Sequence, residues 1–368
     1  MNNNTFEAAA AASATELKTQ KPGKAKRIVI GADQHLQSSQ ASRKIDNGVV
    51  GAVGNFRSQA ELLLWIEKQT ELAEEVVVVY EAGPLGFGLY RELRARGVRC
   101  YVCAPDSSQQ KKTRRKNNTI DTRTLTSNLF SYLNGNEQAL QLVRVPTEEQ
   151  ERARLESRQH DQLVKERKRL GAQGNALLLS QGFGSWKNWW RPKTFSRLSQ
   201  LVPQWVQQML LTWADILRNL DQKIRAAKAA LAKRCQGARP KGAGAVSLVQ
   251  LEAEILDWKR YSNPRKIGCL AGMVPSEWST GKSQWLGAIT KVGVPAIRRI
   301  ITEMVWRIIL FQAQYHAVKK WKEVLAGKNR GLKKKAVVAI GRQLIVDLWR
   351  LRTGRATAEQ LGLVMIGG

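Results

Sequence analysis

The stretch Val76-Val77-Val78-Val79-Tyr80-Glu81-Ala82-Gly83 decides the fold of the N-terminal part of this chain. Four β-branched residues in a row pack well on a pleated surface, so they predict a strand that is covered on both faces of a sheet. The run ends in the carboxylate of Glu81, which is costly to bury unless a positive group meets it. A strand end that simply reaches water would satisfy this carboxylate equally well.

Two further carboxylates favour a functional interpretation of Glu81. Asp33 closes a second apolar strand, and Asp121 lies in the first turn of a predicted helix. Asn118 precedes Asp121 by three residues, so both share one helical face. Acidic and amide oxygens that come from separate elements and meet at one sheet edge are suitable ligands for Mg²⁺. The sequence therefore predicts a metal site with the ligands Asp33, Glu81, Asn118 and Asp121.

The charge of the chain indicates the kind of partner. Its 368 residues include 60 Lys and Arg but 30 Asp and Glu, which gives a formal net charge of +30 that is spread along the sequence. Such an excess predicts a polyanionic partner, with nucleic acid favoured over an anionic membrane surface. The sequence has no apolar run of the roughly 18 residues that a membrane-spanning helix needs. The alanines at 8–12 are too short a core for a signal peptide, so we expect a cytoplasmic, nucleoid-associated protein.

The four cysteines are Cys100, Cys103, Cys235 and Cys269. The first two have the CxxC spacing of a zinc site. However, they lie in an apolar strand pattern, there is no second CxxC, and the chain has three histidines. We therefore favour reduced, buried thiols over a metal site.

Residue patterns divide the chain into four parts. Residues 1–26 form a polar tail that is expected to be disordered. Over residues 27–145, strands predicted at 27–33, 49–56, 76–81 and 98–104 alternate with helices at 58–69, 89–96 and 118–133, which is typical of a layered α/β domain. Two long helices follow within 146–236, and shorter helices follow within 237–368. The fold class is therefore α/β in the first domain and all-α in the rest.

The helix predicted at 204–233 carries an apolar seam with alternating steps of four and three residues. Its members are Val206, Leu210, Trp213, Leu217, Leu220, Ile224, Ala227 and Leu231. Such a heptad repeat predicts a coiled coil. The seam has two alternative partners: the helix at 147–180 of the same chain, or a second chain. We expect it to hold subunits together in a homo-oligomer. Trp186, Trp189 and Trp190, between the two helices, fit contacts with a polyanion.

A loop predicted between Pro275 and Lys291 places the hydroxyl groups of Ser279 and Thr280 beside Gly281. This composition suits a phosphate-binding loop, although hydroxyl residues are also common in ordinary turns. A basic turn is predicted at 328–335. The remaining candidate phosphate contacts are Lys111, Lys112, Arg114, Arg115, Lys116, Lys282, Lys291, Arg298 and Arg299.

These motifs occur in the order found in one family. The N-terminal ones are Gly31-Ala32-Asp33, Glu81-Ala82-Gly83, Pro105 and Lys116-Asn117-Asn118-Thr119-Ile120-Asp121-Thr122. The C-terminal ones are Ala271-Gly272-Met273-Val274-Pro275, Ser279-Thr280-Gly281, Ile289-Thr290-Lys291-Val292-Gly293 and Arg298-Arg299. With these motifs the chain resembles the DEDD transposases of bacterial insertion sequences, which include the pilin-gene invertase and the bridge-RNA-guided recombinases.

The resemblance implies an RNase H-like (RuvC-like) domain with four acids, a coiled coil, and a helical transposase domain with a catalytic serine. It implies a DNA transposase or recombinase in which this serine attacks phosphodiesters with the help of Mg²⁺ and forms a covalent protein–DNA intermediate. The implied partners are donor and target DNA, a structured non-coding bridge RNA, and further copies of the chain in a dimer or tetramer.

Two positions differ from the family pattern. Asn118 stands where an aspartate is expected, so one negative charge of the metal site is missing. The residue next to Gly281 is Thr280, which leaves Ser279 and Thr280 as alternative nucleophiles. A primary hydroxyl is less hindered, which favours Ser279. The alternative function is a nucleic-acid-binding relative of such transposases with impaired catalysis.

Overall fold

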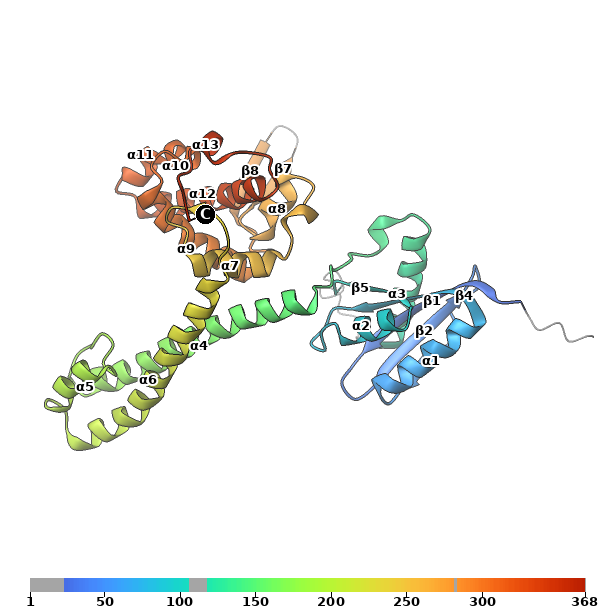
Figure 1. The fold of residues 1–368 in the computed structure, drawn as a ribbon, viewed down its shortest axis with the longest axis horizontal. Helices are drawn as coiled ribbons and strands as arrows, with labels where there is room; N and C mark the ends of the chain where they lie inside the picture. Colours follow the sequence, from blue (N-terminus) through green and yellow to red (C-terminus); the bar gives the residue numbers. More distant parts are fainter. Residues whose placement is uncertain (1–22, 106–117, 281–282, 368) are drawn as a thin grey trace, which may run out of the picture. The chain divides into compact units, whose positions relative to one another are not determined.

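A computed structural model describes residues 23–105, 118–280 and 283–367 of the chain. The chain divides into two compact units, residues 1–145 and 146–368, which are described separately (Figure 1). The predicted tail at 1–26 lies almost entirely outside the described residues.

The first unit is built on a five-stranded mixed sheet. Its strands are β1 (Ala25–Gln34), β2 (Ser39–Ile45), β3 (Gly54–Phe56), β4 (Ala73–Glu81) and β5 (Arg99–Cys103). Their order is β3-β2-β1-β4-β5, so β1 lies in the middle. On one side β2 and β3 continue as an antiparallel meander, and on the other side β4 and β5 run parallel to β1.

The valine run of β4 is buried on both faces, as its sequence predicted. Val76 and Val78 pack with helices α1 (Gln59–Leu72) and α2 (Gly88–Ala95) in one core. Val77 and Val79 belong to a second core on the other face, together with Leu125 and Leu129 of helix α3 (Asn118–Leu133) and Leu140 beside the 3-10 turn η2 (Glu137–Ala139). The sheet is therefore the middle of three layers.

Two elements of this unit differ from the prediction. Strand β2 was missed because its sequence, SQASRKI, lacks an apolar alternation. Its buried residues Ser39, Ala41 and Ser42 are small, and they are covered by the neighbouring strands β1 and β3 and by helix α3. The strand predicted at 49–56 is shortened to β3, and Val49 is exposed.

The second unit begins with a pair of long helices, α4 (Glu148–Ser180) and α6 (Gln204–Lys233), which pack along each other. The short helix α5 (Pro192–Ser199) contributes to their common core. Five members of the heptad seam are fully buried in the single chain: Val206, Leu210, Leu217, Ile224 and Leu231. The intrachain alternative is therefore correct, and the prediction that this seam joins subunits is wrong.

The tryptophans between these helices are core residues rather than a nucleic-acid contact. Trp189 and Trp190 are buried, and Trp186 is partly buried beside them. Their rings pack on Gly174 and Gly171 of α4, where a Cβ atom would collide with the indole groups. Polar partners inside the chain satisfy the ring nitrogens, because Trp189 donates to the Gly171 carbonyl and Trp190 donates to Asp221. The predicted role of this cluster in binding a polyanion is wrong.

Apolar faces of four helices form the core of the C-terminal part: α7 (Ala245–Ile255), α8 (Pro264–Leu270), α9 (Pro295–Phe311) and α12 (Arg330–Arg352). Shorter elements complete it, namely the 3-10 turn η3 (Trp258–Arg260), helices α10 (His316–Lys320), α11 (Lys322–Ala326) and α13 (Ala358–Leu361), and the paired strands β6 (Arg239–Pro240) and β9 (Met365–Ile366).

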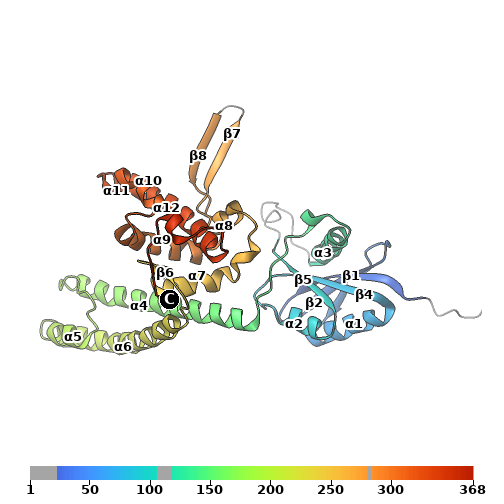
Figure 2. The same ribbon diagram turned by 45° about the horizontal axis from the view of Figure 1, so that its top comes forward.

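One further element leaves this compact core. Strands β7 (Pro275–Thr280) and β8 (Ser283–Ile289) form an antiparallel hairpin that projects from the C-terminal helices (Figure 2). Within the described ranges, no helix is long and apolar enough to cross a membrane.

Candidate functional site

The sheet places two of the predicted acids next to each other. Strands β1 and β4 are parallel neighbours, and Ala32 is paired with Tyr80. Asp33 and Glu81 are the next residues along each strand. Because side chains alternate along a strand, both acids share the face of Val29, Val77 and Val79, which is the face covered by α3. Both side chains are partly buried.

Helix α3 brings Asp121 to the same face, and its position depends on Gly31 of β1. The Gly31 amide donates to the hydroxyl oxygen of Thr126 at 2.9 Å. A Cβ atom at Gly31 would lie 2.6 Å from the backbone nitrogen of Thr126 and 2.7 Å from the carbonyl oxygen of Thr122. The backbone of α3 therefore touches the sheet, and this close packing fixes the turn of the helix that carries Asp121.

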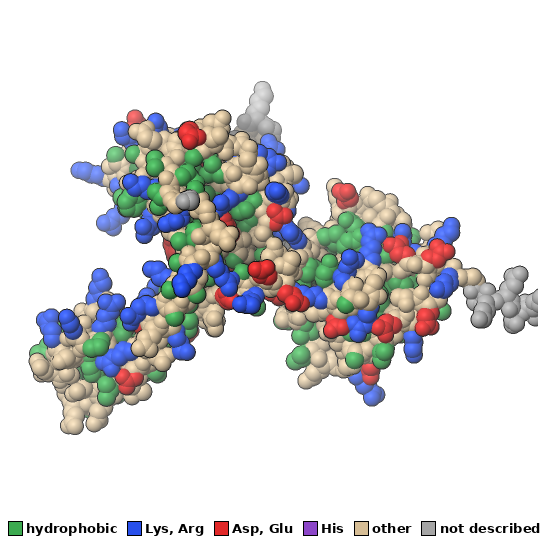
Figure 3. Space-filling model, viewed as in Figure 1, with side chains coloured by type: hydrophobic (Ala, Val, Ile, Leu, Met, Phe, Trp, Pro, Cys, Tyr) green, Lys and Arg blue, Asp and Glu red, His purple; other side chains and the backbone are tan. Residues whose placement is uncertain are grey.

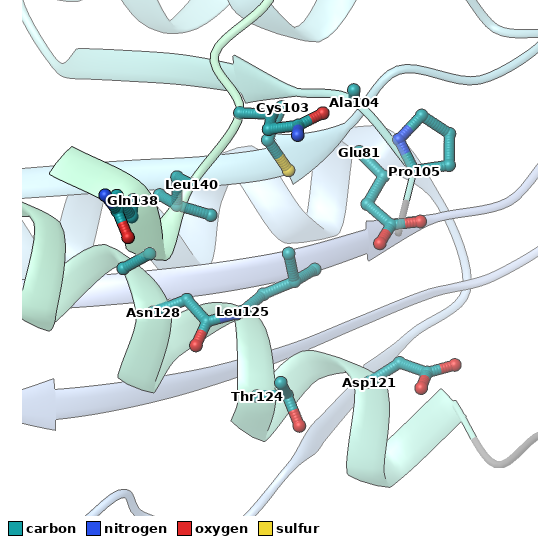
Figure 4. A pocket seen from close by; sticks show the side chains of 12 residues that line it. Glu81, Cys103, Ala104, Pro105, Asp121, Thr124, Leu125, Asn128, Gln138 and Leu140 are labelled. Atoms are coloured by element: carbon teal, nitrogen blue, oxygen red, sulfur yellow. The ribbon is translucent and has the colours of Figure 1, made fainter. Parts of the chain in front are cut away.

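A pocket of about 210 Å³ lies between α3 and the ends of β4 and β5 (Figure 4). Glu81 and Asp121 lie toward one end of it, and Asn128 and Gln138 lie toward the other. Leu125, Leu140 and Cys103 also line it. The carboxylate end can take a cation or a hydrogen-bond donor, and the rest offers apolar surface and amides.

The pocket is not lined by Asp33, whose carboxylate lies 3.1 Å from Nε2 of His35. Among the residues that the structure describes, no three His, Cys, Asp or Glu side chains gather into a group that could hold a metal ion. Asn118 begins α3, but its side chain lies outside the described part. The sequence pattern does not single out His35, which lies two residues after Asp33 and just past the end of β1.

Burial favours the protonated form of the Cys103 thiol, which lines the pocket. Burial, and secondarily the negative charge of Glu81, raise the pKa of Cys103 to about 12. Cys103 and Cys100 are buried as predicted, but Cys269 is exposed and Cys235 is partly exposed, so the expectation of four buried thiols was wrong.

The loop predicted from Pro275 to Lys291 is the β7–β8 hairpin, so this prediction was wrong. Thr280 is paired with Ser283, which leaves two residues, Gly281 and Lys282, between the strands. A two-residue connection that begins with glycine is a recognised hairpin signal between β-prone segments. The hydroxyl residues of the motif therefore lie on a two-stranded ribbon rather than in a loop.

The ribbon separates the two candidate nucleophiles. Successive side chains of a strand point to opposite faces, so Ser279 and Thr280 cannot face the same phosphate. Ser279 shares its face with Glu277, and its hydroxyl donates to the Glu277 carboxylate at 2.6 Å. Thr280 shares its face with Trp278. Glu277 is thus a candidate base for Ser279, and its position two residues away was the sequence signal for this pairing.

Backbone contacts hold the base of the hairpin. The guanidinium of Arg298 donates to the carbonyls of Ala271 (2.9 Å) and Lys291 (3.2 Å). Arg299 pairs with Asp161 and with Glu303. The structure therefore gives these two predicted phosphate contacts partners inside the chain, whereas the side chain of Lys291 is exposed.

The other predicted phosphate contacts divide into two groups. Lys111, Lys112, Arg114, Arg115, Lys116 and Lys282 lie outside the described residues. The predicted basic turn at 328–335 is instead the start of α12 from Arg330 onward, capped by Asn329. Its cations Lys328, Arg330, Lys333, Lys334 and Lys335 have no ion pair among the described residues. Lys and Arg side chains are also distributed over the face shown in Figure 3.

Residues 238–320, which contain the hairpin, match the family described as Transposase IS116/IS110/IS902 family. Two proteins of Sinorhizobium fredii are similar over a longer range. "Putative transposase y4rJ" is 28% identical over 332 residues, which is 82% of each chain. "Putative transposase y4qE" is 28% identical over 277 residues, which is 71% of this chain and 66% of that protein. Residues 238–320 thus match the domain of a transposase family, and most of the chain is similar to two proteins described as putative transposases.

Proposed function

We propose that the chain is an RNA-guided DNA transposase in which Ser279 attacks a DNA phosphodiester. The observation that carries this proposal is the hydrogen bond between the Ser279 hydroxyl and the Glu277 carboxylate on an exposed ribbon. A hydroxyl that is held by a base at 2.6 Å meets the geometric requirement for an activated nucleophile.

The bond changes of this step are those of a transesterification. Glu277 accepts the proton of the Ser279 hydroxyl while the serine oxygen forms a bond to phosphorus. The bond from phosphorus to one sugar oxygen breaks, and that oxygen takes up a proton and leaves as a free hydroxyl. The product is a phosphoserine diester that links the protein to DNA, and reversal of the step on another strand rejoins DNA.

The acidic face of the sheet supplies the second part of the proposal. Glu81 and Asp121, which line one end of the pocket, would hold Mg²⁺, and Asn118 at the start of α3 could add a neutral oxygen. Two carboxylates fit this ion, because Mg²⁺ in phosphoryl-transfer sites takes one or two carboxylates and completes its shell with water and phosphate oxygens. When bound, the cation neutralises charge that develops on the phosphate. We propose that the RNase H-like fold suggested by the motifs serves this purpose, and the mixed sheet with a central first strand is compatible with it.

Positive charge at the start of α12 supports binding of nucleic acid. Five cations lie at residues 328–335 without ion pairs among the described residues. Cations at a helix N-terminus oppose the helix dipole, so an anionic partner at this position would relieve an unfavourable arrangement. Guidance by a bridge RNA and assembly into a homo-oligomer rest on the family resemblance. We expect the affinity for DNA and for RNA to fall markedly as the salt concentration rises.

The test is a covalent adduct between the full chain and its junction DNA, measured on a denaturing gel with guide RNA and Mg²⁺. Ser279→Ala should abolish the adduct, and Glu277→Gln should reduce it by about 10²–10⁴-fold if Glu277 is the base. Thr280→Val is the matched control, because it removes the neighbouring hydroxyl at similar volume. If Thr280→Val loses the adduct while Ser279→Ala still forms it at the wild-type level, Thr280 is the nucleophile. An unchanged adduct in both variants would reject serine chemistry.

Asn118 supports a second candidate function, a nucleic-acid-binding relative with impaired catalysis. Restoring the carboxylate with Asn118→Asp should strengthen metal binding and increase adduct formation several-fold over the wild type, since Mg²⁺ prefers anionic oxygen. Asn117→Asp, which adds the same charge one residue away, is the control. If Asn118→Asp has no effect while the wild type forms adduct, Asn118 is not a weakened metal ligand. If the wild type forms none and Asn118→Asp does, the binding protein is the better description.

A further inference from the structure

The second face of the β7–β8 ribbon carries an exposed aromatic pair. Trp278 and Trp285 are directly opposite each other in the strand register, and 68% and 72% of their surfaces are accessible. Large exposed aromatics are unusual on a soluble surface unless they bind something. They differ sharply from Trp189 and Trp190, which the α4–α6 core covers.

Small neighbours leave room for these rings. Gly287 lies beside Trp278, and a Cβ atom at this position would lie 2.5 Å from Cζ3 of the indole and 2.6 Å from the Ser276 hydroxyl oxygen. That hydroxyl donates to the Ala288 carbonyl at 2.9 Å, across the ribbon. The absence of a side chain at Gly287 therefore lets the Trp278 ring lie flat across β8.

We propose that Trp278 and Trp285 form a platform on which unpaired bases of the substrate DNA stack, on the face of the ribbon opposite the one that presents Ser279. The proposal rests on the proposed function, because it takes Ser279 on the opposite face of the same ribbon as the nucleophile. An indole ring stacks on the face of any base, and such stacking tolerates all sequences. Aromatic or apolar side chains can also separate neighbouring base pairs and leave bases unstacked.

Charge decides between DNA and a second copy of the chain as the occupant. The chain carries a formal net charge of +30, so a polyanion is attracted to this face more strongly than another positively charged chain would be. The exposed Lys291 stands at the base of the ribbon, where it can meet a phosphate next to a stacked base. In a fully paired duplex the base faces are covered by their neighbours, so the platform requires unpaired or unstacked bases.

The experiment compares two DNA probes with the full chain in Mg²⁺-free buffer. One is a duplex with a bulge of two 2-aminopurine nucleotides, whose fluorescence falls on stacking, and the other is the same duplex fully paired. Trp278→Ala and Trp285→Ala should each weaken binding to the bulged probe about tenfold, in the range of one aromatic–base stack. Binding to the paired duplex should be unchanged. The slope of log affinity against log salt should also be unchanged, because no phosphate contact is lost.

Leu286→Ala is the matched control, because Leu286 is an exposed apolar residue of the same ribbon and lies on the face of Glu277. It should leave both affinities unchanged. Trp278→Phe, which keeps an aromatic ring and the cross-strand pair, should recover most of the affinity even if Trp278→Ala loosens the hairpin.

Three results would overturn the platform: an equal loss on both probes, no loss with the bulged probe, or a fall in molecular mass in the tryptophan variants that reveals a contact between copies. The outcome is separable from that of the serine test. If the bulged probe stacks on the protein but neither the wild type nor any variant forms the adduct, Ser279 is rejected as the nucleophile and the platform stands. If the adduct forms but the probe does not stack, the platform is rejected and the nucleophile stands.

Discussion

The acidic face of the sheet and the β7–β8 ribbon hold their reactive groups in opposite ways. On the sheet, Asp121 comes from a helix whose backbone touches Gly31, with buried side chains around it. On the ribbon, Ser279 and its neighbours are exposed, and a hydrogen bond to Glu277 orients the hydroxyl. Core packing fixes the first region, whereas strand pairing and a hydrogen bond fix the second.

This difference suits the proposed division of work. Carboxylates that hold a cation must keep their geometry before the substrate arrives, and close packing provides this preorganisation. A nucleophile that joins different DNA strands must approach several phosphates, which an exposed ribbon permits. The same glycine substitution should therefore have very different effects in the two regions.

The largest effect is expected for Gly31→Ala. The added Cβ atom would meet backbone atoms of α3, which cannot move alone, so the helix carrying Asp121 must shift. We expect a loss of about 1–3 kcal/mol in the free energy of unfolding, which is typical of overpacking, together with a loss of DNA cleavage. Urea denaturation and the adduct assay measure the two effects. Gly88→Ala is the control, because a Cβ atom at that helix position meets nothing within 4 Å and should leave both unchanged. Full activity of Gly31→Ala would show that the position of α3 does not matter for the reaction.

An intermediate effect is expected from alkaline pH, through the buried thiols of the sheet. Burial raises the pKa of Cys100 and Cys103 from 9.0 to about 12, and burial also raises the pKa of Tyr80. These groups bind their protons more tightly in the folded state, so their contribution to stability is complete below pH 9 and is lost as the pH rises toward 12. Urea denaturation at pH 7.5 and 10.5 should show that a Cys100→Ala variant loses less stability over this range than the wild type. Cys269→Ala, at an exposed site, should behave like the wild type. Equal losses in all three proteins would contradict the assignment.

The smallest effect is expected for Gly287→Ala on the ribbon. Here the added Cβ atom meets the ends of the Trp278 and Ser276 side chains, which can rotate away into solvent. We expect a change below about 0.5 kcal/mol in the free energy of unfolding, as for an ordinary surface substitution. Weaker stacking of the bulged DNA probe should accompany it, because the Trp278 ring is displaced. A destabilisation as large as that of Gly31→Ala would mean that the ribbon is as tightly packed as the sheet.

Local sequence signals sufficed where an element buries a regular pattern. The valine run predicted a strand covered on both faces, and Val76 to Val79 alternate between the two cores. The helix predicted at 58–69 is present as α1, and its N-cap is Ser58, whose hydroxyl accepts from the Glu61 amide. The helix predicted at 204–233 has those same bounds, since its heptad pattern runs along its whole length.

Local sequence signals failed where contact with another segment of the chain decides the local structure. Strand β2 consists of small and polar residues that become a strand only because β1 offers a free edge. The composition of the hairpin predicts a loop because Ser, Thr and Gly are common in turns, but Ser279 and Thr280 become strand residues through the pairing of β7 with β8. The segment 186–190 by itself predicts an exposed cluster of tryptophans, because nothing in it shows that two glycines of α4 make room for the rings.

The sequence by itself determined the chemical inventory of this protein: the acids at two strand ends and one helix start, the hydroxyl pair beside a glycine, and the excess of positive charge. The tertiary structure decided which of these groups meet. Packing of α3 on Gly31 brings Asp121 into the pocket with Glu81, and the pairing of β7 with β8 turns Ser279 toward Glu277 and Thr280 toward the tryptophans. The physical reason is that residue types and spacings follow from the chain alone, whereas the contacts between distant segments depend on close packing and strand register.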